Sequence, residues 1–190
     1  KSLYCYMFHN FHDYKSFFNL FYNDLLILKK RGYIHKIGVS LHSNQEILEV
    51  LKNDIIDVIQ LPFNLLDNAS QREYFLRLAK NKGIEVHSRS VFLQGLFFKD
   101  INKINGKISV LRNDLSKVRK ICKNEIINKF ALNYACSKDY IDYVLIGVDS
   151  LRQLKENINS LKNIKKDTDF QEIDKIIVKD SSMLNPVNWK

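Results

Sequence analysis

The chain has 190 residues, of which 45% are hydrophobic, and this is enough for one globular domain with a substantial core. That composition excludes a disordered tail and a small scaffold held by disulfides. Lys and Arg number 30 against 21 Asp and Glu, a formal net charge of +9. The basic residues are scattered and interleaved with acidic ones, which is typical of solvated helix faces and argues against a basic nucleic-acid-binding module.

The cysteines and the apolar runs indicate the cellular compartment of the protein. Cys5, Cys122 and Cys136 are odd in number, far apart and without a C-x-x-C pair, so neither a disulfide framework nor a structural zinc site is predicted. The longest apolar stretches, such as Leu3–Phe8 and Leu25–Leu28, are too short to cross a bilayer, and the N-terminus lacks the layout of a signal peptide. We therefore expect a soluble, cytoplasmic protein.

Five short apolar runs predict strands. Their apolarity is continuous rather than alternating, which indicates strands buried on both faces. The runs are Leu3–Phe8, Lys36–Val39, Asp57–Gln60, Ile84–His87 and Tyr143–Ile146. A stretch with helical period follows each of them, and this alternation favours parallel βα units.

The first helix is predicted over about residues 15–31. Its apolar residues recur at helical spacing and are Phe17, Phe18, Phe21, Leu25 and Leu28. Gly32 ends this helix as a C-terminal cap. A second helix is expected from about Asn44, and a third covers about residues 71–82 and ends at Gly83.

The long interval between the fourth and fifth predicted strands holds more than one βα unit. We expect a long loop there, followed by helices near Leu111–Cys122 and Glu125–Cys136. The helix after the fifth strand is capped by Asp149 or Ser150. A further helix is predicted around Phe170–Val178, before a polar tail.

Five parallel strands leave two architectures open. They cannot close a barrel of eight, and as an open sheet they expose unpaired backbone groups at Leu3–Phe8. The chain is therefore either a doubly wound open sheet or part of a longer fold.

Generic catalytic signatures are missing from the sequence: it has no G-x-G-x-x-G, P-loop, G-x-S-x-G or H-E-x-x-H motif. In parallel βα folds the C-terminal ends of the strands face the active site, so polar residues there become the candidates. They are His9, Asn10, Ser40, Gln60, Ser88 to Ser90, and Gly147 to Ser150.

These candidates suggest chemistry but do not settle it one by one. His9 can donate a hydrogen bond or act as an acid, or it can be an ordinary core or surface histidine. The spacing of His9, His12 and Asp13 hints at a metal, but no further ligand has helpful spacing, and no metal site is predicted. A hydroxyl at Ser40 and an amide at Gln60 are suited to a planar carboxamide.

Taken in order, four segments resemble the aldo-keto reductase superfamily. They read GYIHKIGVS at 32–40, DVIQLPFNLLD at 57–67, RSVFLQGL at 89–96 and IGVDSLRQLKEN at 146–157. The resemblance covers essentially the whole chain and makes Leu3–Phe8 the fourth strand. It implies an α/β fold, an incomplete (β/α)8 TIM barrel with parallel strands four to eight and their helices. Residues 1–190 are then the C-terminal part of the barrel domain, with the first three βα units absent.

The function that the resemblance implies is that of an oxidoreductase, the NAD(P)H-dependent reduction of an aldehyde or ketone to an alcohol. Members of this family use a Tyr acid with Lys, Asp and His around it. His9 matches that His, where it orients the carbonyl oxygen. The Tyr, Lys and Asp belong to the absent units, so the fragment alone is expected to be inactive. The alternative is a non-catalytic, reductase-like subunit that binds the cofactor.

The same resemblance assigns the cofactor residues. Ser40 and Gln60 match the positions that hold the nicotinamide carboxamide, and Arg89 stands where many members stack a Tyr on the nicotinamide. The pyrophosphate loop matches at Ser90, Phe92, Gln94 and Gly95. The adenosine ribose is expected near Gly147, Val148 and Asp149, and the adenine near Gln153 and Asn157.

NADP(H) is the expected cofactor, with NAD(H) as the alternative. Many NADPH-specific members carry Lys-Ser where this chain has Gly147 and Val148, so the charge for a 2′-phosphate is left to Arg152 or Lys155. The expected partner is a small-molecule carbonyl substrate, with no nucleic acid and no membrane.

Overall fold

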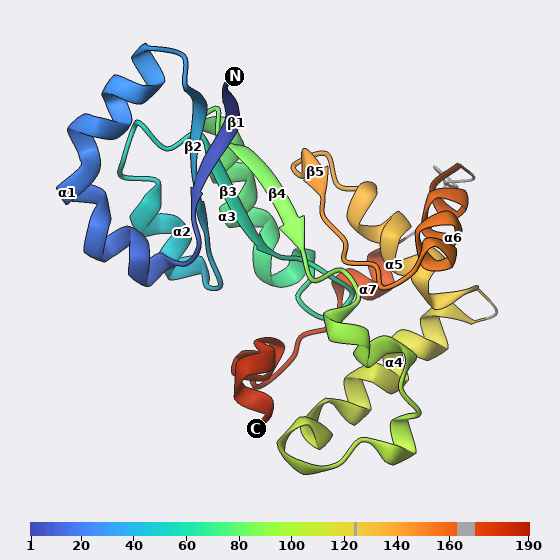
Figure 1. Cartoon of the computed structure of the whole chain (residues 1–190). Coiled ribbons are helices and arrows are strands. Elements are labelled where there is room, and N and C mark those ends of the chain that lie inside the picture. Colours follow the sequence, from blue (N-terminus) through green and yellow to red (C-terminus); the bar gives the residue numbers. More distant parts are fainter. Residues whose placement is uncertain (124, 163–169) are drawn as a thin grey trace. The chain divides into compact units, whose positions relative to one another are not determined.

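A computed structural model describes residues 1–123, 125–162 and 170–190 (Figure 1). The chain forms two compact units. The first comprises residues 1–61 and 74–87, and the second comprises residues 62–73 and 88–190.

The strands are hydrogen-bonded in chain order, β1-β2-β3-β4-β5. Their bounds are Leu3–Phe8, Ile34–Ser40, Val58–Pro62, Glu85–Arg89 and Tyr143–Val144. β1 pairs with β2, and β2 with β3, in parallel. All five predicted strands are confirmed, and every predicted bound lies within two residues of the observed one. The predicted burial on both faces is correct for most of β2 and β3. It is wrong for β1, where only Phe8 is buried, and for β5, where neither residue is.

Three helices follow the first three strands: α1 (Phe11–Lys30), α2 (Asn44–Val50) and α3 (Ala69–Asn81). α1 begins where the side chain of Asn10 accepts a hydrogen bond from the N–H of Asp13 at 2.8 Å. Gly32 follows the end of α1 with a φ of +73°, a conformation that glycine adopts without strain.

The buried face of α1 consists of Tyr14 and two of the apolar residues that predicted the helix, Phe18 and Leu25. The rings of Tyr14 and Phe18 lie 4.9 Å apart and pack on Phe8 of β1. Phe17 and Phe21 are each 46% exposed. The helix carries aromatic residues on two neighbouring stripes, and the earlier start at Phe11 brings Tyr14 into the stripe that meets β1.

A polar cluster, here called the Glu85 cluster, joins three strands of the first unit and consists of Tyr4, Lys36, Glu85 and His87. Glu85 Oε2 accepts hydrogen bonds from Tyr4 Oη, at 2.7 Å, and from Lys36 Nζ, and Oε1 lies 2.5 Å from His87 Nε2. Lys36 Nζ also donates to Tyr4 Oη at 2.8 Å. Burial tends to raise the pKa of Glu85, but the hydrogen bonds from Lys36, Tyr4 and His87 lower it to about 2.

The second unit is mainly helical. Its helices are α4 (Arg112–Cys122), α5 (Ile127–Cys136), α6 (Leu151–Lys162) and α7 (Gln171–Asp174). Short 3₁₀ turns between residues 93 and 111 form the predicted long loop. The helix predicted around Phe170–Val178 is only four residues long in the structure. Its predicted extension is wrong: beyond Asp174 the chain leaves the helix, and the backbone carbonyls of Ile173 and Ile176 accept hydrogen bonds from the side chain of Asn68.

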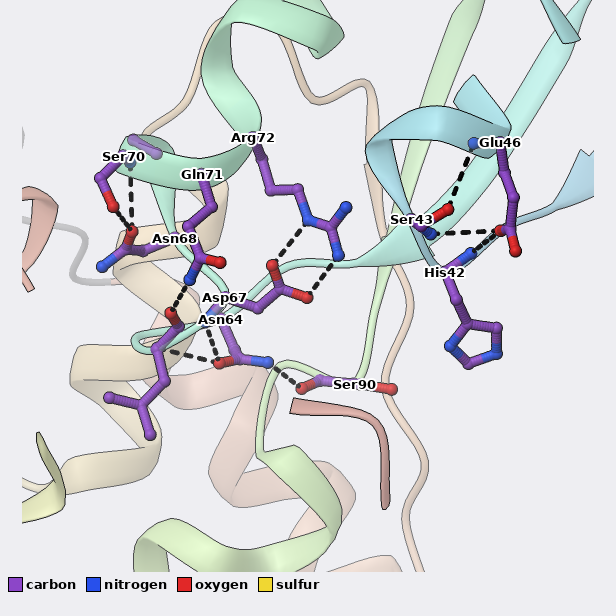
Figure 2. Close-up of polar contacts among 12 residues, drawn as sticks. His42, Ser43, Glu46, Asn64, Asp67, Asn68, Ser70, Gln71, Arg72 and Ser90 are labelled. Atoms are coloured by element: carbon purple, nitrogen blue, oxygen red, sulfur yellow. Dashed lines mark hydrogen bonds and ion pairs between the residues drawn. The ribbon is translucent and has the colours of Figure 1, made fainter. Parts of the chain in front are cut away.

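The loop between β3 and α3 is held by a buried ion pair. Arg72 Nε and Nη2 donate to the two carboxylate oxygens of Asp67, at 2.6 and 2.8 Å (Figure 2). The side chains are 9% and 2% exposed. Each group compensates the charge of the other, since neither has enough contact with water to be solvated alone.

Candidate functional site

A cavity of about 690 Å³ lies within the second unit. Its walls come from the loop after β4, from the segment after β5 and from the first half of α6. Eight residues predicted from the sequence to bind a cofactor line it: Ser90, Phe92, Gln94, Gly95, Gly147, Asp149, Gln153 and Asn157. The structure therefore brings together three segments that are up to 67 positions apart in the chain.

The loop after β4 has an unusual backbone. Ser90, Leu93 and Gln94 have φ angles of +58°, +45° and +48°, and Gly95 has +78°. Residues other than glycine rarely adopt these left-handed backbone conformations. Where they do, they are concentrated at sites that bind ligands. The concave backbone that such turns create is suited to binding anions.

The start of α6 forms the opposite wall. Ser150 Oγ accepts a hydrogen bond from the N–H of Gln153 at 3.2 Å, so Ser150 is the cap residue of the two that the sequence left open. Gln153 Oε1 accepts from the N–H of Asp149 at 2.7 Å. Asn157 is buried, and its Oδ1 accepts from Asn128 Nδ2 of α5 at 3.5 Å. These bonds fix the amide groups on one wall of the cavity.

Charged groups on the cavity wall are few. Among the described residues, Arg152 is the one basic residue that lines the cavity, beside the acidic residues Asp149 and Glu156. Arg152 Nε lies 3.8 Å from Glu156 Oε1, and the Arg152 side chain is 84% exposed. Lys155, the other predicted source of positive charge, does not line the cavity.

Three further candidates lie in the first unit: His9 follows the end of β1, Ser40 is the last residue of β2, and Gln60 is the middle residue of β3. Ser40 is the register partner of Gln60, and the N–H of Leu41 donates to the carbonyl of Gln60 at 2.7 Å. Paired residues of parallel strands project to the same face, so the Ser40 hydroxyl and the Gln60 amide share one face. His9 follows Phe8, whose register partner Val39 precedes Ser40.

The two faces of β1 can be told apart by what packs on them. A Cβ added at Gly38 would lie 3.0 Å from Met7 Cε and 3.1 Å from Cys5 Sγ, so these two side chains share the face of β1 next to Gly38. Phe8 packs on the other face, against α1. Strand alternation continued by one residue places His9, which is exposed, with Cys5 and Met7.

Two predicted residues lie outside the cavity wall. Val148 does not line it, and neither does Arg89, whose Nη1 donates to Ser90 Oγ at 3.3 Å. The contacts proposed for Arg89, Val148, Ser40, Gln60 and His9 with a cofactor or substrate stay predictions.

Some lining residues were missed from the sequence, among them Phe98 and Asn128. Asn128 lies on α5, 29 positions before its partner Asn157, and no local pattern marks it.

Other kinds of site receive no support from the described residues. No group of three His, Cys, Asp or Glu side chains among them is placed to hold a metal ion. Within residues 1–123, 125–162 and 170–190, no helix combines the length and the apolar character needed to cross a membrane. Cys5, Cys122 and Cys136 are free thiols, and burial raises the pKa of Cys5 to about 11.

The family can now be stated. The model of the aldo/keto reductase family matches residues 3–178. The chain therefore belongs to this family, as its sequence motifs predicted. A comparison with curated proteins gives no match.

Solved structures agree on the fold. The holo form of the aldo-keto reductase AKR11C1 from Bacillus halodurans matches with a TM-score of 0.72 and 20% identity, over 95% of this chain and 62% of that one. The apo form of Gox0644 matches with a TM-score of 0.68 and 16% identity, over 95% and 60% of the two chains. A thermostable aldo-keto reductase, Tm1743, in complex with the inhibitor epalrestat, matches with a TM-score of 0.62 and 16% identity, over 96% and 60%. This chain thus spans about three-fifths of their length.

Proposed function

We propose that the complete protein is an NAD(P)H-dependent aldo-keto reductase that reduces an aldehyde or ketone to the alcohol. In this proposal the five strands are strands four to eight of a (β/α)8 barrel, and residues 1–190 supply the cofactor-binding side. The observation that carries the proposal is the cavity whose wall contains eight of the predicted cofactor residues. Its volume of about 690 Å³ falls in the range of about 300–1,000 Å³ that is usual for small-molecule and cofactor sites.

The residues of the cavity fit the adenosine diphosphate part of a dinucleotide. The loop from Ser90 to Gly95, with four residues in left-handed conformations, is suited to the pyrophosphate because its concave backbone favours an anion. The segment from Gly147 to Asp149 would contact the ribose. The amides of Gln153 and Asn157 would hold the adenine, whose edge presents both donors and acceptors.

For the reacting end of the cofactor and the substrate, the proposal assigns Ser40, Gln60 and His9. The Ser40 hydroxyl and the Gln60 amide are register partners on one face, and together they would bind a planar carboxamide. A bound nicotinamide cofactor would supply the hydride for the carbonyl carbon, and the Tyr acid that the resemblance assigns to the first three βα units would supply the proton that completes the alcohol. His9 would donate a hydrogen bond to the carbonyl oxygen and stabilise the negative charge that develops there.

Binding of the dinucleotide tests this proposal directly. Replacing the buried Asn157 by Leu keeps a similar size but removes the amide, so we expect affinity for NADPH and for ADP-ribose to fall about tenfold, as the loss of one or two hydrogen bonds implies. Isothermal titration calorimetry of the complete protein measures this. Asn159→Leu is the matched control, because Asn159 is exposed on the same helix and outside the cavity. Equal affinities of both variants, or no binding by the wild type, contradict the proposal.

Arg152 should set the preference between the two cofactors. Its guanidinium is the basic group that a 2′-phosphate would meet in this cavity, but it is exposed and partly screened by Glu156. We expect Arg152→Gln to weaken NADPH binding about fivefold and NADH binding less than twofold, in fluorescence titrations of both cofactors. Lys155→Gln is the control. Lys155 does not line the cavity, so its replacement should change neither affinity. A loss of the same size for both cofactors would remove Arg152 from this role.

A further inference from the structure

Asn64 lies in the loop that follows β3 and is fully buried. Its side-chain Oδ1 accepts hydrogen bonds from the N–H groups of Leu66 and Asp67, at 2.9 and 3.0 Å. Its Nδ2 donates to the backbone carbonyl of Ser90 at 3.2 Å (Figure 2). One amide group therefore shapes its own turn and reaches a second loop 26 positions later in the chain.

Ser90 is the first of three non-glycine residues in that second loop with a positive φ. Its φ of +58° is a left-handed conformation that a serine does not adopt without strain, so the surrounding structure has to hold it. The carbonyl of Ser90 accepts from Asn64 Nδ2 and from the N–H of Leu93, at 3.2 and 2.9 Å. The preceding carbonyl, of Arg89, accepts from the N–H of Phe63 at 3.0 Å.

These bonds fix the orientation of the peptide group that links Ser90 to Val91. The carbonyl oxygen and the N–H of a trans peptide lie on opposite edges of one plane, so the N–H of Val91 points away from Asn64. Both Ser90 and Val91 line the cavity. The Asn64 side chain, which lies in a different loop, therefore helps to fix the direction in which the N–H of Val91 points.

We propose that Asn64 is the positioning residue of the cofactor loop: its amide N–H, bonded to the Ser90 carbonyl, holds Ser90 in its left-handed conformation and so keeps loop 90–95 in the shape that receives the pyrophosphate of a dinucleotide. This inference rests on the proposed function for its ligand. Asn64 itself does not line the cavity, so its effect on binding is transmitted through Ser90.

The sharpest variant is Asn64→Asp. The carboxylate keeps the shape of the side chain and an acceptor for Leu66 and Asp67, but the atom that faces the Ser90 carbonyl can no longer donate. The matched control is Gln71→Glu, which makes the same chemical change beside the same loop: Gln71 lies in the first turn of α3, and its Nε2 donates to the carbonyl of Leu66 at 3.0 Å. If the buried charge keeps Asn64→Asp from folding, the neutral Asn64→Ser replaces it, since a serine hydroxyl supports the same turn but is too short to reach Ser90.

Two measurements on the complete protein decide the question. Hydrogen–deuterium exchange of the ligand-free protein should become at least tenfold faster at residues 90–98 in the Asn64 variant and stay unchanged in α6, whereas Gln71→Glu leaves both segments unchanged. Calorimetry should show NADPH affinity at least tenfold lower in the Asn64 variant alone. Adding Ser90→Gly should restore much of the slow exchange, because glycine adopts the left-handed form without a tether.

The outcomes separate this inference from the proposed function. Wild-type exchange rates and wild-type NADPH affinity in the Asn64 variant overturn the positioning role and leave the proposed function standing. Faster exchange in a protein whose wild type binds no dinucleotide overturns the proposed function, and with it the pyrophosphate as ligand. An effect of equal size in Gln71→Glu shows that the whole loop, rather than the bond to Ser90, is responsible, and that also overturns the inference.

Discussion

Replacing Arg72 by Met is expected to lower the free energy of unfolding by about 3–5 kcal/mol at pH 7, because it leaves the Asp67 carboxylate buried without its cation. The aliphatic part of Met fills a similar volume, so the lost charge rather than a cavity dominates the effect. Urea unfolding followed by circular dichroism measures the change. Lys117→Met is the control: Lys117 pairs with Asp114 at 2.7 Å but is largely exposed, and its loss should cost less than about 1 kcal/mol.

The double variant Asp67→Asn with Arg72→Met refines this test. It removes both charges and should recover part of the lost stability, because no buried charge is left unpaired. A single Arg72→Met variant as stable as the wild type would show that water reaches Asp67 and that the pair is dispensable.

His9 should have the largest effect on turnover. In the complete protein we expect His9→Ala to lower kcat about 100-fold, the usual loss when one hydrogen bond to a developing oxyanion is removed, and to change NADPH affinity less than twofold. Steady-state kinetics with an aromatic aldehyde and a cofactor titration measure the two quantities. His12→Ala is the control, since His12 is exposed on the first turn of α1.

Two results would count against this role of His9. Unchanged turnover per folded molecule, together with lower stability and weaker cofactor binding, would make His9 structural. No turnover by the wild type with any aldehyde or ketone, despite tight dinucleotide binding, would favour a non-catalytic cofactor-binding subunit.

The strands were predictable because their signal is local. β2 and β3 are largely buried and mostly apolar, and β1 carries an apolar run although most of it is exposed. Neighbouring strands in this sheet follow in chain order. The buried face of α1 was predictable only in part, since Tyr14 and Phe17 are both aromatic and only the contact with Phe8 decides which of them is buried. Periodicity identifies a helix but does not choose between two adjacent apolar stripes.

The candidate site also contains residues that the sequence identified and one that it did not. Ser90, Gly147 and Gln153 were found because each stands directly after a strand or in the first turn of the next helix, positions that the resemblance marks. Asn64 was missed. Its acceptor bonds to Leu66 and Asp67 make an ordinary asparagine turn, and its donor bond to Ser90 is a tertiary contact that no local pattern announces.

The Glu85 cluster affects how substitutions in this protein combine. One carboxylate serves Tyr4, Lys36 and His87, so removing one donor leaves the other two in place. Removing Glu85 instead takes the partner from all three at once. Effects at these positions therefore will not add, and a change tolerated at Tyr4 in one background can be harmful in another. In a comparison of related sequences, the four positions of the Glu85 cluster should therefore be considered together.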